Sequence, residues 1–568
     1  MFPFTRLPIP LPKIFASKTS WLEQQQTSIL SAAFIITLAN VVSSISGLIR
    51  QRLLISAFFN TQSSQEAFEA LLVAFQIPDT MFQLIVLGAL SAAFIPVFST
   101  LKRKDEKAAF GMSAVVINLL LLVFITTSVI VGIFAEPITL WRTGDAFTAN
   151  QVTIAANLTR IMMIAQIFFA ISNLLSAVLQ SYQRFILPSI APILYNVGIV
   201  SGVYFLSPMF GIYSAGIGVC IGAFMHMIIQ LPLAYKLGFR FGWSFNLRYP
   251  GVKELFTLIP PRVLTIGITE IQNLSLGFFA TSLGNLSFVV IRLALTLMAL
   301  PIRLFGVPIS QASLPFLSEQ TEEKDKQRFK DLILQSLNQI AFFAFPASVL
   351  LLILRIPIVR LLFGTSNFPW ATTLMTGRAV ALISISIAAQ AMVQLLIRGF
   401  HAVKDTQTPL IITLTTVVSY LIGSSYVVFF TDFGVLGIAA VTSVSAFIEL
   451  GLFLLAFHSK VSKILSPAFW IPQVKMVGAS FLMAVFLYLP FRILDEVVFN
   501  TTKTVELIAL TITTGTIGMV VYTYFAALFE IKELHLMTTM LRSINKWKNG
   551  VVKTNEFVVD TSMEDGNI

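Results

Sequence analysis

Two stretches with the same layout decide how this chain folds. Residues 174–197 read LLSAVLQSYQRFILPSIAPILYNV, and residues 394–417 read QLLIRGFHAVKDTQTPLIITLTTV. In each, an apolar segment is followed by an aromatic residue, a short polar turn and a proline near the start of the next apolar segment. Proline is tolerated in the first turn of a helix but not in its interior. Each stretch therefore predicts two helices joined by a tight turn, and the recurrence predicts two related halves.

The composition around these stretches is that of a membrane protein. Of the 568 residues, 56% are hydrophobic and only 11% are charged, whereas soluble domains average about 25% charged residues. Mean hydropathy is +0.84. A soluble, disordered or fibrous protein is excluded, because too few charged residues are present to cover a soluble surface.

Apolar windows of roughly 20 residues, the length of a membrane-spanning helix, occur fourteen times. They are residues 29–58, 70–100, 113–135, 157–181, 188–206, 210–234, 254–282, 287–317, 336–357, 375–399, 409–430, 434–457, 472–491 and 504–529. Long unbroken runs indicate helices, because a transmembrane barrel alternates over about ten residues. The chain is therefore predicted to be an all-α polytopic membrane protein.

The repeated stretches lie six spans apart, so the two copies share one orientation in the membrane. Parallel repeats of this kind predict two six-helix lobes around a central space, as in alternating-access transporters, with two further helices at the C-terminus. The predicted organisation is a cytoplasmic N-terminal segment (1–28), an N-lobe (29–234), a cytoplasmic loop (235–253), a C-lobe (254–457), two additional spans (458–530) and a cytoplasmic C-terminal tail (531–568).

The basic residues predict the orientation. With the N-terminus in the cytoplasm, 26 of the 38 Lys and Arg residues fall in inner segments or near inner span ends, eight fall in outer segments or near outer span ends, and the other four lie deeper within spans. Membrane proteins keep Lys and Arg in cytoplasmic loops, so both termini are predicted to be cytoplasmic. The net charge of +11 is then a topology signal, and no nucleic-acid partner is expected.

Motifs for catalysis or metal binding are not found. Cys220 is the only cysteine and there are four histidines, and no P-loop ending in GKS or GKT occurs. The chain is predicted not to be an enzyme, with no metal site and no cofactor.

Arginines within or beside spans are the first candidate site residues, because a charge in the bilayer core is costly and faces protein or water. Arg50 and Arg52 lie about 200° apart on a helix, so one is expected to face the interior and the other to reach toward the membrane surface. Arg292 and Arg303 are three turns apart on one face, about 16 Å along the axis. Arginine binds phosphate in a bidentate manner, so these residues suit an anionic ligand. Structural pairing within the bundle is the alternative.

Carboxylates form the second group of candidates. Glu66 and Glu69 share one helix face, and Glu69 is expected to hold an arginine in place. Glu270, with Asn273 one turn later, is a candidate proton or sodium ligand, and a salt bridge from Glu270 to Arg262 is the alternative.

Several motifs resemble one family. They are SSISGLIR (43–50), VAFQIPDTMFQLIVLGALSAAFIPVFS (73–99), QSYQRFILPSIAPILYN (180–196), SLPFLSEQ (313–320) and KDTQTP (404–409). Together they resemble the MurJ/MviN lipid II flippases of the multidrug/oligosaccharidyl-lipid/polysaccharide exporter superfamily. The resemblance covers about residues 29–530 and implies fourteen spans. It also implies transfer of the undecaprenyl-diphosphate-linked peptidoglycan precursor to the outer leaflet of the bacterial inner membrane.

The sequence departs from the family pattern at several charged positions. Ser44 and Gln51 replace an arginine and an acid of the opening motif, Phe82 and Leu87 replace an arginine and a glutamate of the second span, and Thr296 replaces an arginine of the eighth. Among the family's substrate-binding arginines, only Arg50 carries over directly. An acid of the second span is matched by Glu69, and Arg292 lies one turn from Thr296.

The resulting expectation is a flippase for the lipid-linked peptidoglycan precursor that works by alternating access. The expected cavity residues are Arg50, Arg52, Glu69, Arg292 and Arg303, and the expected ion-coupling residues are Glu270 and Asn273. The driving force is left open among membrane potential, sodium and protons. The expected partners are the lipid precursor, membrane lipids and cell-wall synthesis proteins, with the chain itself a monomer. The alternatives are another exporter of the superfamily, for a lipid-linked oligosaccharide or a drug or cation, and a non-transporting cell-wall scaffold.

Overall fold

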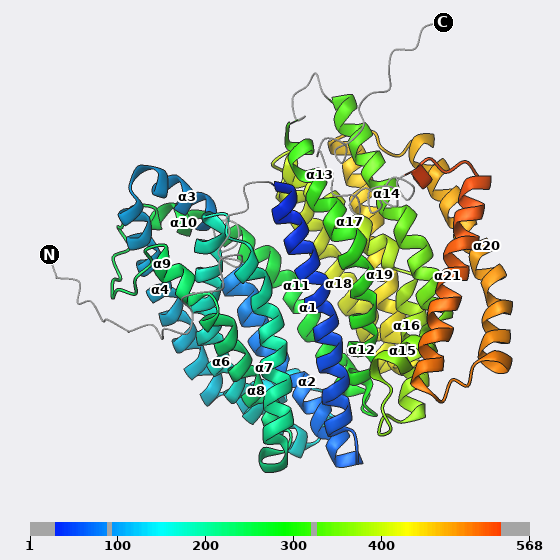
Figure 1. The fold of residues 1–568 in the computed structure, drawn as a ribbon, viewed down its shortest axis with the longest axis horizontal. Helices are drawn as coiled ribbons and strands as arrows, with labels where there is room; N and C mark the ends of the chain where they lie inside the picture. Colours follow the sequence, from blue (N-terminus) through cyan, green and yellow to red (C-terminus); the bar gives the residue numbers. More distant parts are fainter. Residues whose placement is uncertain (1–28, 88–93, 259, 320–325, 536–568) are drawn as a thin grey trace, which may run out of the picture.

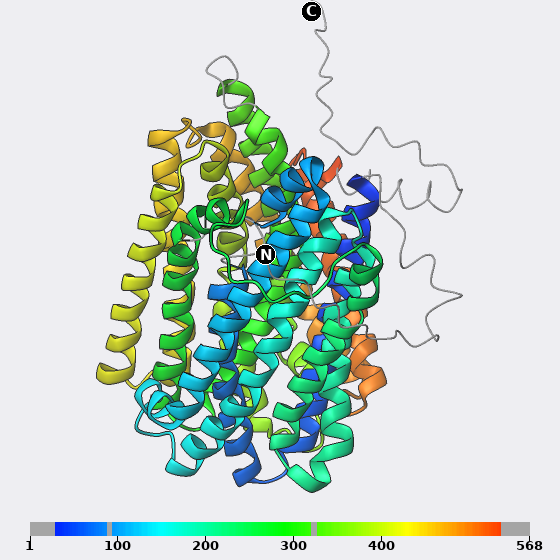
Figure 2. The same ribbon diagram turned by 90° about the vertical axis from the view of Figure 1, so that its left-hand side faces the viewer.

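The computed structural model describes residues 29–87, 94–258, 260–319 and 326–535, and these residues contain helices and no β-strand. The predicted all-α fold is confirmed. The predicted N-terminal segment 1–28 and nearly all of the predicted C-terminal tail lie outside the described residues. Figures 1 and 2 show a bundle of long, roughly parallel helices with short connections.

The helices form the two expected lobes and a C-terminal pair. The N-lobe consists of α1 (Ile29–Phe58), α2 (Gln62–Phe82), η2 (Gln83–Leu87), α3 (Ile95–Lys104), α4 (Glu106–Ile133), α5 (Ala135–Arg142), α6 (Ala149–Ser181), α7 (Ile186–Phe210), α8 (Tyr213–Ile228) and α9 (Leu231–Lys236). After α10 (Val252–Leu258), the C-lobe consists of α11 (Pro260–Ser282), α12 (Ser287–Pro301), η4 (Ile302–Gly306), α13 (Val307–Glu319), α14 (Lys326–Ile353), α15 (Arg355–Phe363), α16 (Trp370–Ser384), α17 (Ile387–Ala402), α18 (Gln407–Phe430) and α19 (Gly434–Lys460). The final pair is α20 (Pro467–Ile493), extended by η6 (Leu494–Val498), and α21 (Thr504–Leu528).

The predicted number of spans agrees with the structure. Thirteen described helices are long and apolar enough to cross a membrane, and α16 with α17 makes a fourteenth if this pair, bent by 47°, is one span. The first predicted span, 29–58, coincides with α1.

Some predicted spans are less regular than expected. The second span, predicted to be continuous over 70–100, changes to a π-helix at Gln83 and continues as α3 from Ile95. The seventh, predicted over 254–282, is divided into α10 and α11, because Pro260 and Pro261 occupy the start of α11, where proline is accommodated without a lost hydrogen bond.

The two repeated turns have the same backbone conformation. Gln183 and Lys404 both adopt left-handed geometry, with φ values of 57° and 61°. The next residue in each turn donates its backbone N–H to a carbonyl five positions earlier, Arg184 to Leu179 and Asp405 to Phe400, both at 2.9 Å. This is the Schellman pattern of helix termination. The expected helix–turn–proline unit is therefore present in both halves.

The buried apolar side chains show how the lobes meet. We call the end of the bundle with the α1–α2 and α15–α16 turns the outer end, and the end with α3 and α13 the inner end (Figure 1). One apolar cluster crosses both lobes toward the outer end, where Phe59 packs on both Phe68 and Phe368. Toward the inner end each lobe has its own cluster, around Phe98 in the N-lobe and Phe400 in the C-lobe. The lobes thus share a core at one end only.

Candidate functional site

Arg50 lies on α1 and is oriented by α7. Its Nη1 donates a 3.0 Å hydrogen bond to Oδ1 of Asn196. The amide nitrogen of Asn196 in turn donates to the Ser46 hydroxyl at 2.7 Å and to the Ser43 carbonyl at 3.3 Å. The buried Nε of Arg50 has no hydrogen-bond partner in the described residues. Arg50 is therefore held on one side and retains donor capacity on the other.

Asp79, on α2, lies between charged groups of both lobes. Its carboxylate is within electrostatic range of Arg292 and Arg50, which attract it, and of Glu270, which repels it. The side chain is nevertheless exposed to solvent. Asp79 is therefore an acid of the N-lobe that charged groups of both lobes influence.

Glu270 and Asn273 of α11 lie together, as their spacing predicted. Glu270 is buried and accepts hydrogen bonds from Thr80 Oγ1 at 2.9 Å and from Asn273 Nδ2 at 3.2 Å. The backbone carbonyl of Asn273 accepts from Gln76 Nε2 at 2.9 Å. The pair therefore joins α11 to α2 across the lobe interface. The side chain of Arg262, the alternative partner of Glu270, lies outside the described residues.

The two arginines of the eighth span differ. Arg292, in α12, is half-buried and acts on Asp79, whereas Arg303, in η4, is exposed. Neither guanidinium makes a hydrogen bond within the described part of the chain. Arg292 joins the group of Arg50, Asp79 and Glu270, which we call the central charge cluster. This cluster places one arginine and one carboxylate on each lobe.

Arg52 lies outside the central charge cluster. Its Nη1 donates to the backbone carbonyl of Leu361 on α15, so it bridges the lobes near the outer end. Asn367 reinforces this contact by donating to the Ser56 carbonyl at 3.2 Å. The expectation that the arginine opposite Arg50 reaches toward the membrane surface is therefore wrong for Arg52.

Glu69 is also placed differently from the expectation. It is buried and accepts hydrogen bonds from Gln151 Nε2 at 3.1 Å and from the backbone N–H of Phe288 at 3.2 Å. Phe288 is the second residue of α12, and that helix has no side-chain cap of its own. Glu69 thus caps the N-terminus of a C-lobe helix from the N-lobe, and a carboxylate there is favoured by the helix dipole. The expectation that Glu69 holds an arginine is wrong.

Further contacts close the outer end. The backbone N–H of Gly144, which follows α5, donates to Thr281 Oγ1 of α11 at 2.9 Å. A Cβ on Gly144 would lie 2.3 Å from the Cα of Ser282, so only glycine permits this approach. Together with the contacts of Glu69 and Arg52, this contact joins the lobes between the central charge cluster and the outer surface.

Asp79 is the residue that sequence reasoning missed. It follows Pro78 in the quoted stretch VAFQIPDTMF, and an acid in an apolar span is itself a functional signal. A proline in a helix interior leaves the carbonyl four residues earlier without its usual partner. Thr159 Oγ1 lies 3.4 Å from that carbonyl, of Ala74, and the buried Arg142 donates to the adjacent carbonyl of Val73. Packing by α5 and α6 therefore supports the irregular turn that carries Asp79.

Two positions of family departure have structural roles. Phe82 packs edge-on against Phe169, with ring centroids 5.5 Å apart. Thr296 is exposed, and its hydroxyl donates to the Arg292 carbonyl at 2.8 Å. Leu87 ends η2, and its side chain lies outside the described residues.

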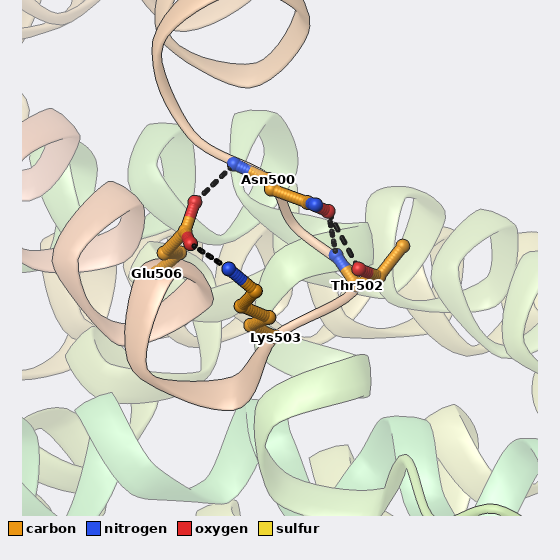
Figure 3. A network of polar contacts seen from close by, with 4 residues as sticks. All are labelled: Asn500, Thr502, Lys503 and Glu506. Atoms are coloured by element: carbon orange, nitrogen blue, oxygen red, sulfur yellow. Dashed lines mark hydrogen bonds and ion pairs between the residues drawn. The ribbon is translucent and has the colours of Figure 1, made fainter.

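Other polar groups lie away from the cluster. Figure 3 shows the outer turn between α20 and α21, where Glu506 binds Lys503 Nζ at 3.2 Å and accepts from the backbone of Asn500. The side chain of Asn500 in turn accepts from Thr502. Within the described residues no group of three or more His, Cys, Asp or Glu side chains could hold a metal ion. The central charge cluster therefore remains the best candidate site.

Comparison with protein families gives one match, to the model described as lipid II flippase MurJ, over residues 55–510. Among curated proteins, the lipid II flippase MurJ of Burkholderia cenocepacia is 27% identical over 457 residues, which cover 78% of this chain and 86% of the relative. The probable lipid II flippase MurJ of Thermotoga maritima is 28% identical over 415 residues, covering 72% and 81%.

Solved structures share the fold. A lipid II flippase MurJ in an inward closed conformation superposes with a TM-score of 0.71 at 22% identity, covering 87% of this chain and 98% of that one. An inward-facing multidrug resistance transporter of the MATE family gives 0.62 at 15% identity, covering 76% and 98%. An outward-facing MATE transporter gives 0.55 at 15% identity, covering 79% and 99%. The fold match is thus higher for the inward-facing arrangement.

Proposed function

The chain belongs to the MurJ family of lipid II flippases, and on this premise we propose that it moves lipid II, the lipid-linked peptidoglycan precursor, across the bacterial inner membrane by alternating access. The family is one of transporters, so the central charge cluster is interpreted as a binding site and not as a catalytic one.

The observation that carries the proposal is the position of the central charge cluster between two lobes that share a core at the outer end only. A transporter that rocks between two states needs a site that is accessible from one side while the other side is closed. Glu69, Arg52 and Gly144 contribute to closing the outer side here. The structure therefore suits the stage at which substrate enters from the inner end.

Arg50 and Arg292 are the proposed contacts to the diphosphate of the substrate. Both have donor groups that no described residue occupies, and they extend from opposite lobes. Arginine binds phosphate oxygens with two parallel hydrogen bonds, and a site with little water strengthens each bond. The exposed Arg303 is proposed to contact the anionic lipid on its way in. A cation exporter would instead need acids that no arginine faces in this place, whereas Arg292 and Arg50 both act on Asp79.

The proposed orientation places both termini, and with them the inner end, in the cytoplasm. It rests on the excess of Lys and Arg in inner segments. Single cysteines introduced into a Cys220→Ala chain test this orientation. Cysteines at Asn150 and Ser366 should react with an impermeant maleimide added outside, and those at Ser244 and Gln327 should not. The opposite labelling pattern would invert the topology.

The energy source is proposed to act through Glu270 and Asn273. These residues connect the lobes through Thr80 and Gln76, so a proton or sodium ion bound at Glu270 would alter the contact between α11 and α2. Membrane potential remains the alternative driving force. The chain is proposed to work as a monomer without an organic cofactor, beside cell-wall synthesis proteins.

The decisive experiment is complementation of a bacterium depleted of its own flippase, with an assay for lipid II in the outer leaflet. The wild-type chain should restore growth and outer-leaflet lipid II. A reducible crosslink between cysteines placed near Thr61 and near Gly284, on the outer ends of the two lobes, should block transport until it is reduced. Expression at normal levels without restored lipid II would overturn the proposal.

A further inference from the structure

Asp79 is surrounded by charge from both lobes. Arg50 faces it from α1, Arg292 from α12 and Glu270 from α11. Tyr195 of α7 is also within electrostatic range of both Arg50 and Asp79. The carboxylate therefore interacts electrostatically with both arginines that we propose as phosphate contacts.

The two carboxylates of the cluster are not equivalent. Glu270 is buried and engaged by Thr80 and Asn273. The carboxylate of Asp79 is exposed and makes no hydrogen bond or ion pair with any described residue. Asp79 makes no direct ion pair with Arg50 or Arg292, so it acts on these arginines from a distance longer than 4.0 Å. The Glu270 carboxylate is thus hydrogen-bonded at the interface, whereas Asp79 supplies an unengaged negative charge.

Such a charge has a direct effect on anion binding. A carboxylate near two guanidinium groups offsets part of the positive charge that would attract a phosphate. The effect is strongest where little water screens the charges. A phosphate that enters must replace this interaction and also tolerate repulsion by Asp79. The net affinity for the phosphate is set by the free energy of its contacts with the arginines minus the free energy of the interactions between Asp79 and the arginines that it replaces.

We propose that Asp79 is an internal counter-ion that competes with the phosphates of the substrate for Arg50 and Arg292, and so keeps binding weak enough for release. The inference rests on the proposed function for the identity of the substrate. For the competition itself it needs only an anionic phosphate ligand.

The arrangement over the two lobes suggests when the competition acts. Asp79 and Arg50 belong to the N-lobe, and Arg292 belongs to the C-lobe. When the lobes rock, the distance between Asp79 and Arg50 is preserved while Arg292 moves relative to both. A phosphate bound between the arginines then loses one contact, and Asp79 remains beside Arg50 to replace it. Release is therefore favoured without a new residue entering the site.

The test measures binding and turnover in the full-length protein in lipid nanodiscs and proteoliposomes. Asp79→Asn removes the charge and keeps the shape, so it should bind inorganic pyrophosphate and lipid II about three- to tenfold more tightly. Turnover at saturating lipid II should fall, because release slows. Asp79→Glu keeps the charge and should remain within about twofold of wild type.

A matched control is available on the same helix. Glu66→Gln makes the same change in charge at the outer start of α2, where the Glu66 side chain accepts only from Gln62. It should leave both affinities unchanged, which separates a local effect of Asp79 from an effect of net charge.

The outcomes separate this inference from the proposed function. Unchanged or weaker binding of pyrophosphate and lipid II by Asp79→Asn overturns the counter-ion role, even if the wild type flips lipid II. Tighter binding of pyrophosphate by Asp79→Asn, with no binding of lipid II by any variant, supports the counter-ion and contradicts the proposed substrate.

Discussion

The second span of each lobe is interrupted in the same way but carries opposite charge. In the N-lobe, Pro78 of α2 is followed by the π-helix η2, and in the C-lobe Pro301 of α12 is followed by the π-helix η4. Nine residues before the proline stands Glu69 in one span and Arg292 in the other. The repeat thus keeps the break in the backbone, while the charges have diverged.

The break in the backbone and the charges depend on different features of the structure. A proline inside a helix always removes one hydrogen bond and displaces the turn, and π-helical turns often occur at functional sites. Both spans therefore combine a proline with a π-helix, although the π-helix begins five residues after Pro78 and directly after Pro301. Charge, in contrast, needs a partner, and the partners come from the opposite lobe. Glu69 caps α12, and Arg292 faces Asp79 of α2. Each of the two spans therefore supplies a charge that interacts with the other span.

Removing the arginine of the C-lobe span should have the largest effect. Arg292→Ala should lower binding of the lipid diphosphate and flipping by about a hundredfold, because two charge-assisted hydrogen bonds are lost. Arg292→Lys should recover only part of this activity, since lysine lacks the planar fork. Flipping is measured in proteoliposomes with equal amounts of protein. Activity of the alanine variant close to wild type would remove Arg292 from the site.

Removing the acid of the N-lobe span should have a smaller effect of a different kind. Glu69→Ala leaves the first turn of α12 uncapped, at a cost of about 1 kcal/mol, which corresponds to about a fivefold shift toward an open outer end. Spin labels at Ser63 and Ser366 in a Cys220→Ala chain should report a larger population at long distance. Glu69→Gln, which keeps an acceptor oxygen, serves as the control and should shift the population less. An unchanged distance distribution in the alanine variant would contradict the capping role.

The second arginine of the C-lobe span should matter less than the first. Arg303 is exposed and does not belong to the central charge cluster. Arg303→Ala should therefore reduce flipping by less than about threefold. The flipping rate of this variant should also depend less on salt concentration. If its loss were as severe as that of Arg292, the substrate would have to extend along the whole face between the two residues.

The repeated turns give the smallest expected effect, on stability. Asp405 accepts backbone hydrogen bonds from Gln407 at 3.1 Å and Thr408 at 2.9 Å, and a side-chain bond from Thr408 at 2.6 Å. Partial burial alone would raise the pKa of Asp405, but the bonds from Thr408 and the charge of Lys460 outweigh it and lower the pKa. Asp405→Ala should cost about 1 kcal/mol of stability, seen as a lower melting temperature in detergent.

The pH dependence of this effect has a definite sign. A carboxyl whose pKa is lowered by folding stabilises the protein above its unfolded pKa, about 3.9, and this contribution disappears as the pH falls through the lower, folded value. The melting temperatures of wild type and Asp405→Ala should therefore differ at pH 7 and converge below about pH 4. Asp432→Ala, in the turn before α19, controls for the general effect of removing an exposed acid, because the Asp432 carboxylate makes no hydrogen bond or ion pair with any described residue. A constant difference over this pH range would exclude the capping carboxylate as its cause.

Sequence reasoning predicted much of the candidate site, but not which charged residues form the central charge cluster and which close the outer end. Arg50, Arg292 and Glu270 were identified because a charge in an apolar span is costly wherever the span goes. The same reasoning selected Arg52 and Glu69, which close the outer end instead. It applies equally to Asp79, an acid in the same apolar stretch as Glu69.

The sequence by itself determined the class of fold, the spans, the two lobes and the repeated turns. Each of these depends on local rules: about 20 apolar residues cross a bilayer, proline begins helices and left-handed residues end them. Only the tertiary structure decided which charges meet. Arg52 meets Leu361 and Glu69 meets Phe288, over separations of 309 and 219 residues. A helical pattern fixes which residues share a face but not what that face contacts, because the contact depends on the rotation and tilt of two packed helices.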